Sequence, residues 1–254
     1  MPFATLTVDD HIATLTLDAP TAGVGRAEMD SLRDACARIE GSAERIDAVV
    51  VTSAGDDWAS GWNTEALAER GQPSALLAPL GAGCDALAAL PQPSVAAIGG
   101  RALSIGLELA LACDIRVCSQ TARFAMPETA RGLVPMGGGT QRLPRAVGRA
   151  HALLLLLSGE EIDAEEAYRI GLVSQVVPAG EERSAAMAIA RTIASRGPVA
   201  TRFAKEAVRR GIELPLREGL RAELDMTVIL QTTFDRTEGV QAFIERREPR
   251  FTGQ

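Results

Sequence analysis

The chain has 254 residues, 46% of them hydrophobic, and a formal net charge of −7 at neutral pH. This length and apolar content suffice for one large folded domain, or for a domain with an appendage. The acidic balance argues against a nucleic-acid-binding protein, because phosphate binding requires a basic face.

The sequence has no feature of a membrane or exported protein. No apolar run approaches the roughly 20 residues that cross a bilayer, and the run at 152–157 is far shorter. The start, MPFATLTVDDH, lacks the basic residues and apolar stretch of a signal peptide. The cysteines form no C-x-x-C pair, which disfavours zinc and disulfides. The chain has two histidines, His11 and His151. We therefore expect a cytoplasmic protein without membrane partners. Its four cysteines are expected to be buried thiols: Cys36, Cys84, Cys113 and Cys118.

The N-terminal part predicts a hairpin, a helix and a buried strand. FATLTV and IATLTLD alternate apolar and polar residues around residues 9–11, as the strands of a short hairpin do. Residues 27–40 have the spacing of an amphipathic helix, and AVVVTS (48–53) is a β-branched run typical of a buried strand. The stretch 71–83, rich in Gly, Pro and Ala, predicts a mobile loop before a helix at 84–90.

The middle of the chain alternates strands and helices. PSVAAIGG (93–100) predicts a buried strand, LELALA (107–112) a helix, and DIRVCS (114–119) another strand. This order predicts the fold class α/β, with a core of largely parallel strands.

The pattern changes after about Arg196, where three helices follow without a strand between them. We place a boundary near 195–200, which gives an α/β core with the active site (1–195) and a helical segment (196–254). The helical segment is too small to fold independently, so we expect it to pack on the core or on another subunit. The predicted helices are 199–211, 215–234 and 236–247.

Two glutamates on separate glycine-rich motifs are the main candidates for chemistry. Glu108 lies in GGRALSIGLELALACDIRV, and Glu128 lies in FAMPETARGLVPMGGGTQRLP. Two carboxylates in an apolar setting suit a reaction that both removes and delivers a proton. Each has a structural alternative: Glu108 could be an exposed residue on a one-sided helix, and Glu128, after Pro127, could cap a helix start. Burial of Glu108 would raise its pKa.

These motifs resemble the crotonase (enoyl-CoA hydratase/isomerase) family. LVPMGGGTQRL (133–143) is similar to the family signature L-x-P-x-x-G-G-T-Q-R-L. GEEIDAEEAYRIGLVSQVVP (159–178) and EGVQAFIERREPRF (238–251) resemble its later segments. The resemblance implies a crotonase-like spiral of repeated ββα units with a C-terminal helical trimerisation region. It also places Glu108 and Glu128 at the two catalytic positions.

The resemblance also implies an oxyanion hole made of two backbone N–H groups, those of Trp62 and Ile105. DDWASGWNTEAL (56–67) resembles the family loop, with Ser60 and Asn63 at positions where the family has other residues; without the resemblance it reads as an ordinary strand-to-helix turn. Ile105 stands where the family commonly has Gly, and we expect it to be helical. Further substrate contacts are expected at Ala59, Gly61, Gly100, Gly106, Pro135, Gly137 and Gly138.

The implied activity is hydration of trans-2-enoyl-CoA thioesters. The acyl-CoA thioester is then the small-molecule partner, coenzyme A is part of the substrate, and no metal or other cofactor is needed. A double-bond isomerase of the same family and a non-catalytic acyl-CoA-binding subunit are the alternatives. The family assembly implies a homotrimer or homohexamer, with 196–254 completing part of the coenzyme A site. Since AGVGRAEM (22–29) replaces the family's N-A-L-N segment, coenzyme A binding there would use backbone groups.

One competing motif, GAGCDA (81–86), fits the G-x-G-x-x-A pattern of dinucleotide-binding loops. It follows a Pro-rich stretch instead of a strand, and no acidic residue follows a second strand at a suitable distance. We therefore disfavour a nucleotide-dependent oxidoreductase.

Overall fold

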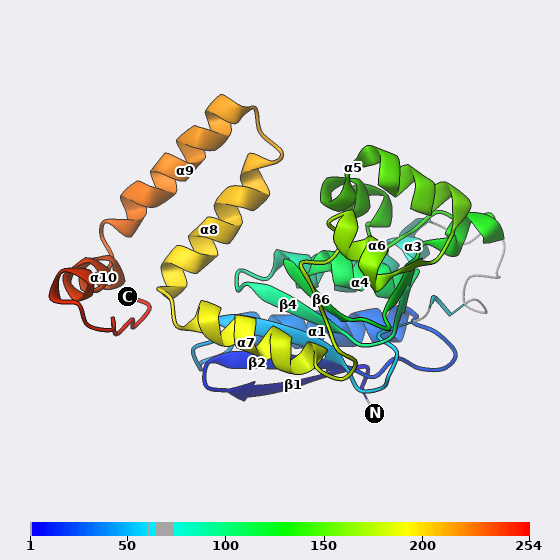
Figure 1. The fold of residues 1–254 in the computed structure, drawn as a ribbon, viewed down its shortest axis with the longest axis horizontal. Coiled ribbons are helices and arrows are strands. Elements are labelled where there is room, and N and C mark those ends of the chain that lie inside the picture. Colours follow the sequence, from blue (N-terminus) through cyan, green and yellow to red (C-terminus); the bar gives the residue numbers. More distant parts are fainter. Residues whose placement is uncertain (1, 60, 64–73) are drawn as a thin grey trace.

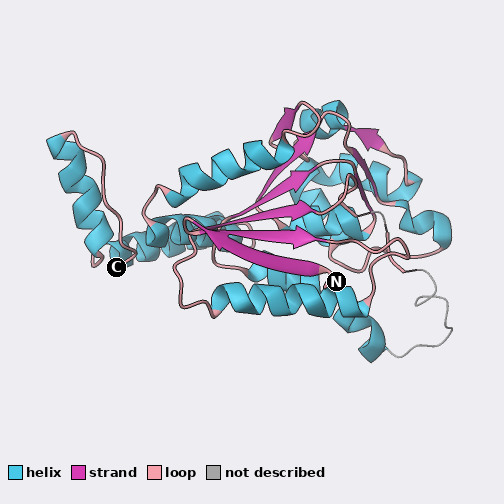
Figure 2. Cartoon of the chain, turned by 90° about the horizontal axis from the view of Figure 1, so that it is seen from below, coloured by secondary structure: helices cyan, strands magenta, loops and turns pink. Residues whose placement is uncertain are grey.

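The computed structural model describes residues 2–59, 61–63 and 74–254, and a six-stranded sheet lies at its centre (Figures 1 and 2). The strand order is β1-β2-β3-β4-β6-β9. Only the β1–β2 pair is antiparallel within this sheet, with Ala4 opposite Leu17, and the other four pairs are parallel. The strands are β1 (Ala4–Asp9), β2 (Ile12–Leu17), β3 (Ala48–Ser53), β4 (Ser94–Ile98), β6 (Ile115–Ser119) and β9 (Gln175–Val177).

Helices cover both faces of the sheet, which explains why β3 and β4 are apolar throughout. Val49 and Val51 of β3 face the larger core cluster with α1 (Arg26–Glu40) and α3 (Ser74–Ala89). Val50, between them, faces the smaller cluster formed with α7 (Glu182–Ala194). Helix α1 follows the amphipathic pattern, with a buried face of Met29, Leu32, Ala35, Cys36 and Ile39.

A second, three-stranded sheet of order β5-β7-β8 lies beside the first. Its strands alternate along the chain with those of the large sheet, which produces the repeated ββα pattern. Helices follow its strands and complete this part of the core. The elements are β5 (Arg101–Leu103), α4 (Ile105–Ala112), β7 (Arg123–Ala125), the 3₁₀ helix η1 (Pro127–Arg131), α5 (Gly139–Ser158), β8 (Ile162–Asp163) and α6 (Ala164–Arg169).

Three C-terminal helices extend away from the core in Figure 1: α8 (Pro198–Gly211), α9 (Leu216–Leu230) and α10 (Phe234–Glu245). Helix α8 is attached to the core by Lys205, the only lysine of the chain. The Lys205 ammonium lies 2.7 Å from a carboxylate oxygen of Asp114 and donates to the Gln92 carbonyl at 2.9 Å. Helix α9 buries none of its residues.

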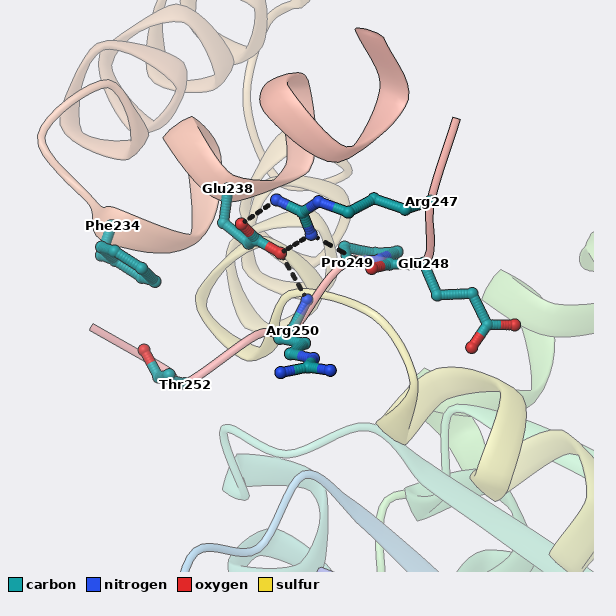
Figure 3. A pocket seen from close by; sticks show the side chains of 7 residues that line it. All are labelled: Phe234, Glu238, Arg247, Glu248, Pro249, Arg250 and Thr252. Carbon is teal, nitrogen blue, oxygen red and sulfur yellow. Dashed lines mark hydrogen bonds and ion pairs between the residues drawn. The ribbon is translucent and has the colours of Figure 1, made fainter. Parts of the chain in front are cut away.

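The last residues fold back onto α10 and line a surface pocket there (Figure 3). Glu238 accepts hydrogen bonds from both terminal nitrogens of Arg247, at 2.6 and 2.9 Å, and from the Arg250 N–H at 2.7 Å. These bonds lower the pKa of Glu238 to about 2. Buried Asp235 accepts from the N–H groups of Thr252 and Gly253. These contacts fix the tail to α10.

The structure confirms the predicted hairpin, the helix at 27–40, the three buried strands, the helix–strand segment at 159–178 and the three C-terminal helices. The three short strands of the second sheet were not predicted. The division into a core (1–195) and a separate C-terminal segment (196–254) stays a prediction. All four cysteines are buried free thiols, as expected. No helix in the described parts of the chain is long and apolar enough to span a membrane.

The predicted loop before residue 84 is wrong for its described part, since α3 already begins at Ser74. The glycines within this helix allow other segments of the chain to pack closely against it. A Cβ at Gly81 would lie 2.8 Å from the Met136 carbonyl oxygen, and one at Gly83 would lie 2.8 Å from the Met29 sulfur. The GAGCDA motif is therefore helical and is no phosphate-binding turn. Residues 71–73 lie outside the described residues, as does Ser60.

Candidate active site

Glu108 is completely buried on α4, a helix in which all eight residues are buried. Its carboxylate oxygen Oε1 accepts hydrogen bonds from the N–H groups of Gly137, at 2.6 Å, and Gly139, at 2.8 Å. Its other oxygen, Oε2, has no partner among the described residues. The exposed-residue alternative is therefore wrong, and Glu108 presents one free oxygen inside the protein.

Glu128 is the second buried carboxylate, with 3% of its surface exposed. It follows Pro127 in the first turn of η1, as the sequence predicts. Its side chain makes no capping hydrogen bond, and both of its carboxylate oxygens lack a partner within the described part of the chain. Capping therefore does not explain Glu128. An unpaired buried carboxylate is costly, which points to a role with a ligand or water.

The structure brings the two glutamates close enough to interact electrostatically. Burial, in first place, raises the pKa of Glu108 from 4.5 to about 7, and the neighbouring Glu128 adds to the increase. The two backbone N–H bonds and the Arg142 guanidinium act in the opposite direction. A carboxyl group with a pKa near neutral pH can both accept and donate a proton, as acid–base catalysis requires.

The loop after β3 is fixed against the start of α4. The indole of Trp58, which is fully buried, donates from Nε1 to the Gly106 carbonyl at 2.9 Å. The Leu103 N–H donates to the Ala59 carbonyl at 3.0 Å, and Ala59 pairs with Ala102 in a parallel bridge. The two segments that carry Trp62 and Ile105 are thus connected by several hydrogen bonds.

Two of the predicted glycines lie where this loop meets the core. A Cβ at Gly106 would lie 2.0 Å from the Ala59 carbonyl oxygen, and one at Gly100 would lie 2.6 Å from an Asp57 carboxylate oxygen. Both positions therefore require glycine for contacts within the protein. Ala59 belongs to the same contact, so the structure gives these three residues a packing role next to the site.

The backbone N–H groups of the two predicted oxyanion-hole residues are unpaired among the described residues. Gly61 (φ +151°) and Asn63 flank Trp62 and bond to Val24, which accepts from Asn63 and donates to Gly61. The N–H groups of Trp62 and Ile105 have no acceptor among the described residues. Ile105 begins α4, where N–H groups lack helical partners.

The turn before α4 is strained at Ser104, not at Ile105. Ser104 has φ 57° and ψ −122°, which is rare for a residue other than glycine and costs about 1–3 kcal/mol. Ile105 is helical, as expected. Ser104 directly precedes Ile105, whose N–H lies at the positive end of α4.

The remaining predicted residues form the loop before α5. Gly137 and Gly139 hold Glu108, so the N–H of Gly137 is used within the protein. Gly138 adopts φ +99°, and a Cβ there would lie 2.2 Å from the Arg142 guanidinium. Pro135 is half-buried and packs close to Gly139. The structure therefore gathers Glu108, Glu128 and this loop at one place between α4 and α5.

Comparison with known proteins identifies the family of the chain. The model of the family described as Enoyl-CoA hydratase/isomerase matches residues 7–254. The chain belongs to the enoyl-CoA hydratase/isomerase family. It is 38% identical over 256 residues to "Probable enoyl-CoA hydratase echA8" of Mycobacterium bovis, which covers 99% of both chains. It is 43% identical over 168 residues to the 2,3-dehydroadipyl-CoA hydratase of Escherichia coli, covering 66% of each.

Solved structures of this family share the fold. The enoyl-CoA hydratase of Bacillus anthracis superposes with a TM-score of 0.93 at 34% identity, covering 99% of this chain and 100% of that one. The architecture is therefore the crotonase fold, and the chain is an enzyme of the enoyl-CoA hydratase/isomerase family. In the described residues, no group of three or more His, Cys, Asp or Glu side chains could hold a metal ion.

The contacts of four residues at or next to this candidate site were not predicted from the sequence: Trp58, Cys84, Gly139 and Arg142. Gly139 lies in the signature itself, whose glycines predict a close approach of the turn to the ligand but not the hydrogen bond to Glu108. Arg142 lies three residues further on and contacts that run. No local pattern identifies Trp58 or Cys84, because both reach the site through contacts between distant segments.

Proposed function

We propose that this family member is an enoyl-CoA hydratase, which adds water reversibly across the C2=C3 bond of a trans-2-enoyl-CoA. The observation that carries the proposal is the pair of buried carboxylates with three unpartnered oxygens, one on Glu108 and two on Glu128. A water molecule held between two carboxylates would satisfy such oxygens. An isomerase, which only moves a proton, needs a single acid–base group.

The proposed oxyanion hole consists of the N–H groups of Trp62 and Ile105. Two such donors would bind the thioester carbonyl oxygen and stabilise the negative charge that develops on it when water adds to C3. The positive end of α4 supports the same charge. This role depends on backbone atoms, so the unusual side chains at both positions are compatible with it.

The two glutamates would share the proton transfers of a syn addition. One carboxylate takes a proton from water as the oxygen bonds to C3, and the other carboxyl group delivers a proton to C2. The electron pair of the C2=C3 bond passes through the enolate and ends in the new C2–H bond. The product is a 3-hydroxyacyl-CoA. The reaction as proposed uses no metal or redox cofactor.

The names of the relatives do not identify one acyl group for the substrate. Those reported above carry names for a general enoyl-CoA hydratase and for a 2,3-dehydroadipyl-CoA hydratase. We propose a trans-2-enoyl-CoA as the substrate class, with the bulk of Trp62 shaping the acyl pocket.

Replacing either donor residue by proline tests the oxyanion hole, because proline has no N–H. Trp62→Pro and Ile105→Pro are expected to lower turnover of crotonyl-CoA by about 10²–10³-fold while the melting temperature and assembly stay near those of the wild type. Trp62→Phe is the control, since it keeps the N–H and should change only the preference among acyl chains. A wild type that binds enoyl-CoA tightly without hydrating it would favour a non-catalytic acyl-CoA-binding subunit.

A further inference from the structure

The loop that holds Glu108 is itself held by a charged pair from two other elements. Arg142, on α5, donates from Nη1 to the Gly137 carbonyl and from Nη2 to an Asp85 carboxylate oxygen at 2.7 Å. Asp85 lies on α3. The Gly137 carbonyl stands in the chain between the two N–H groups, of Gly137 and Gly139, that bind Glu108. Fixing this carbonyl therefore fixes both donors.

The Arg142 guanidinium lies directly against the backbone of the loop. Gly138, at φ +99°, leaves room for the guanidinium, whose Nη1 would be 2.2 Å from any Cβ at that position. The Arg142 N–H also donates to the Gly138 carbonyl at 2.8 Å. The guanidinium thus lies directly against the loop, and its two terminal nitrogens each have one acceptor.

Helix α3 supports the same loop through the segment of the GAGCDA motif. Gly81 allows the Met136 carbonyl to approach, and the Cys84 sulfur would be 3.0 Å from a Cβ at Gly137. Asp85 follows Cys84 directly and reaches Arg142, with 73% of its side chain exposed. These contacts assign a function to a motif that binds no nucleotide here: it seats the loop behind Glu108.

We propose that Arg142, oriented by Asp85, is a positioning residue that fixes the Gly137–Gly139 loop and thereby controls the proton affinity of Glu108. The proposal rests on the proposed function of Glu108 in acid–base catalysis. It adds a residue pair that touches neither substrate nor reacting atoms.

The charges around Glu108 determine the direction of the effect. Glu128, from η1, raises the pKa of Glu108, whereas Arg142 and the N–H groups of Gly137 and Gly139 lower it. Cys84, from α3, is neutral here because burial and the nearby Glu108 raise its pKa. Arg142 is the one cation that acts on Glu108 among the described residues. Removing its charge and loosening the two donors would both shift the titration of Glu108 to higher pH.

A titration without substrate tests this directly. The infrared band of the protonated Glu108 carboxyl, identified by its loss in Glu108→Gln, is followed against pH in the wild type and in Arg142→Gln. We expect the midpoint to rise by about one pH unit in Arg142→Gln, and the pH profile of kcat for crotonyl-CoA to move in the same direction. Arg142→Lys keeps the charge and should restore most of the midpoint.

The matched control is Arg145→Gln on the same helix. Arg145 pairs with Glu213 and makes no hydrogen bond to the loop 137–139. The titration midpoint of Glu108 in Arg145→Gln should therefore equal that in the wild type. If Arg142→Gln does not fold, Asp85→Asn at the exposed position should shift the midpoint upward by a smaller amount. An unchanged midpoint in Arg142→Gln, or an equal shift in Arg145→Gln, would overturn the proposal. A shifted midpoint in a protein that hydrates no enoyl-CoA would leave this proposal intact and contradict the proposed function instead.

Discussion

The indole nitrogen of Trp58 donates a hydrogen bond to the carbonyl of Gly106 at 2.9 Å, across 48 residues of sequence. This bond joins the segment that carries Trp62 to the first turn of α4, which begins at Ile105. The spacing of the two proposed oxyanion donors therefore depends on a side chain that makes no hydrogen bond to either glutamate.

Trp58→Phe removes this bond and keeps an aromatic ring in the core. We expect a loss of about 1–3 kcal/mol in the free energy of unfolding, from the lost hydrogen bond and the smaller ring. We expect turnover to fall by about 10–100-fold, because small displacements of catalytic groups reduce rate strongly. The pH profile of kcat should stay unchanged, since Trp58 makes no hydrogen bond to either glutamate. A shifted pH profile would mean that Trp58 acts on the carboxylates.

Gly106→Ala should disrupt the same junction from the other side. The new Cβ would lie 2.0 Å from the Ala59 carbonyl oxygen, so the loop must move. We expect a destabilisation at or above the upper end of the ~1–3 kcal/mol usual for overpacking, and little remaining turnover. Gly55→Ala is the control, because a Cβ at Gly55 meets no atom within 4 Å. Chemical denaturation of both variants measures the difference, and equal stability would contradict the close contact.

Glu108 should make folding less favourable as the pH rises. Its pKa is about 7 in the folded protein and 4.5 in the absence of burial, so the folded state holds the proton more tightly. This stabilising contribution is complete below about pH 4.5 and is lost as the pH rises through about 7. Because Gln does not ionise, Glu108→Gln does not lose stability in this way as the pH rises. At pH 8 its free energy of unfolding should exceed that of the wild type by up to about 3 kcal/mol. Denaturant titrations from pH 4 to 8 measure this, with exposed Glu218→Gln as the control; parallel pH dependence in wild type and Glu108→Gln would refute it.

The C-terminal helices should bury their apolar residues between subunits. Helix α9 exposes an apolar residue at every fourth position, and a monomer would leave this stripe in water. We expect light scattering to give the mass of a trimer or hexamer at micromolar concentration. Leu220→Glu combined with Leu224→Glu should lower that mass, whereas Arg221→Glu on the same helix should not. A monomeric wild type would contradict the assembly. The stripe consists of Leu216 (78% exposed), Leu220 (55%), Leu224 (61%) and Val228 (59%).

The sequence was sufficient to predict elements whose pattern is local. The β-branched run at 48–53 and the apolar spacing of α1 specify their structure through burial on one or both faces. The short strands β5, β7 and β8 have two or three residues each, so they carry too little pattern to predict. The predicted helix at 84–90 is confirmed, but α3 begins earlier, at Ser74, because the glycines that suggest a loop instead allow other segments to pack closely against the helix.

The candidate site shows the same division. Glu108 and Glu128 could be identified because each is a charged residue in an apolar motif that resembles a known signature. The Trp58–Gly106 and Arg142–Asp85 contacts join segments 48 and 57 residues apart. No spacing rule in one sequence indicates such pairs, since they depend on how the two sheets and α3 meet.

The measurement that tests the central claim most directly is hydration by the wild type, Glu108→Gln and Glu128→Gln. Each protein is incubated with crotonyl-CoA and with a long-chain trans-2-enoyl-CoA, and loss of the conjugated thioester absorbance is followed. We predict that the wild type hydrates at least one substrate and that both folded variants lose about 10²–10⁴-fold in rate, because each lacks one proton carrier. Near-normal activity of Glu108→Gln beside an inactive Glu128→Gln would contradict the hydratase mechanism and favour the isomerase.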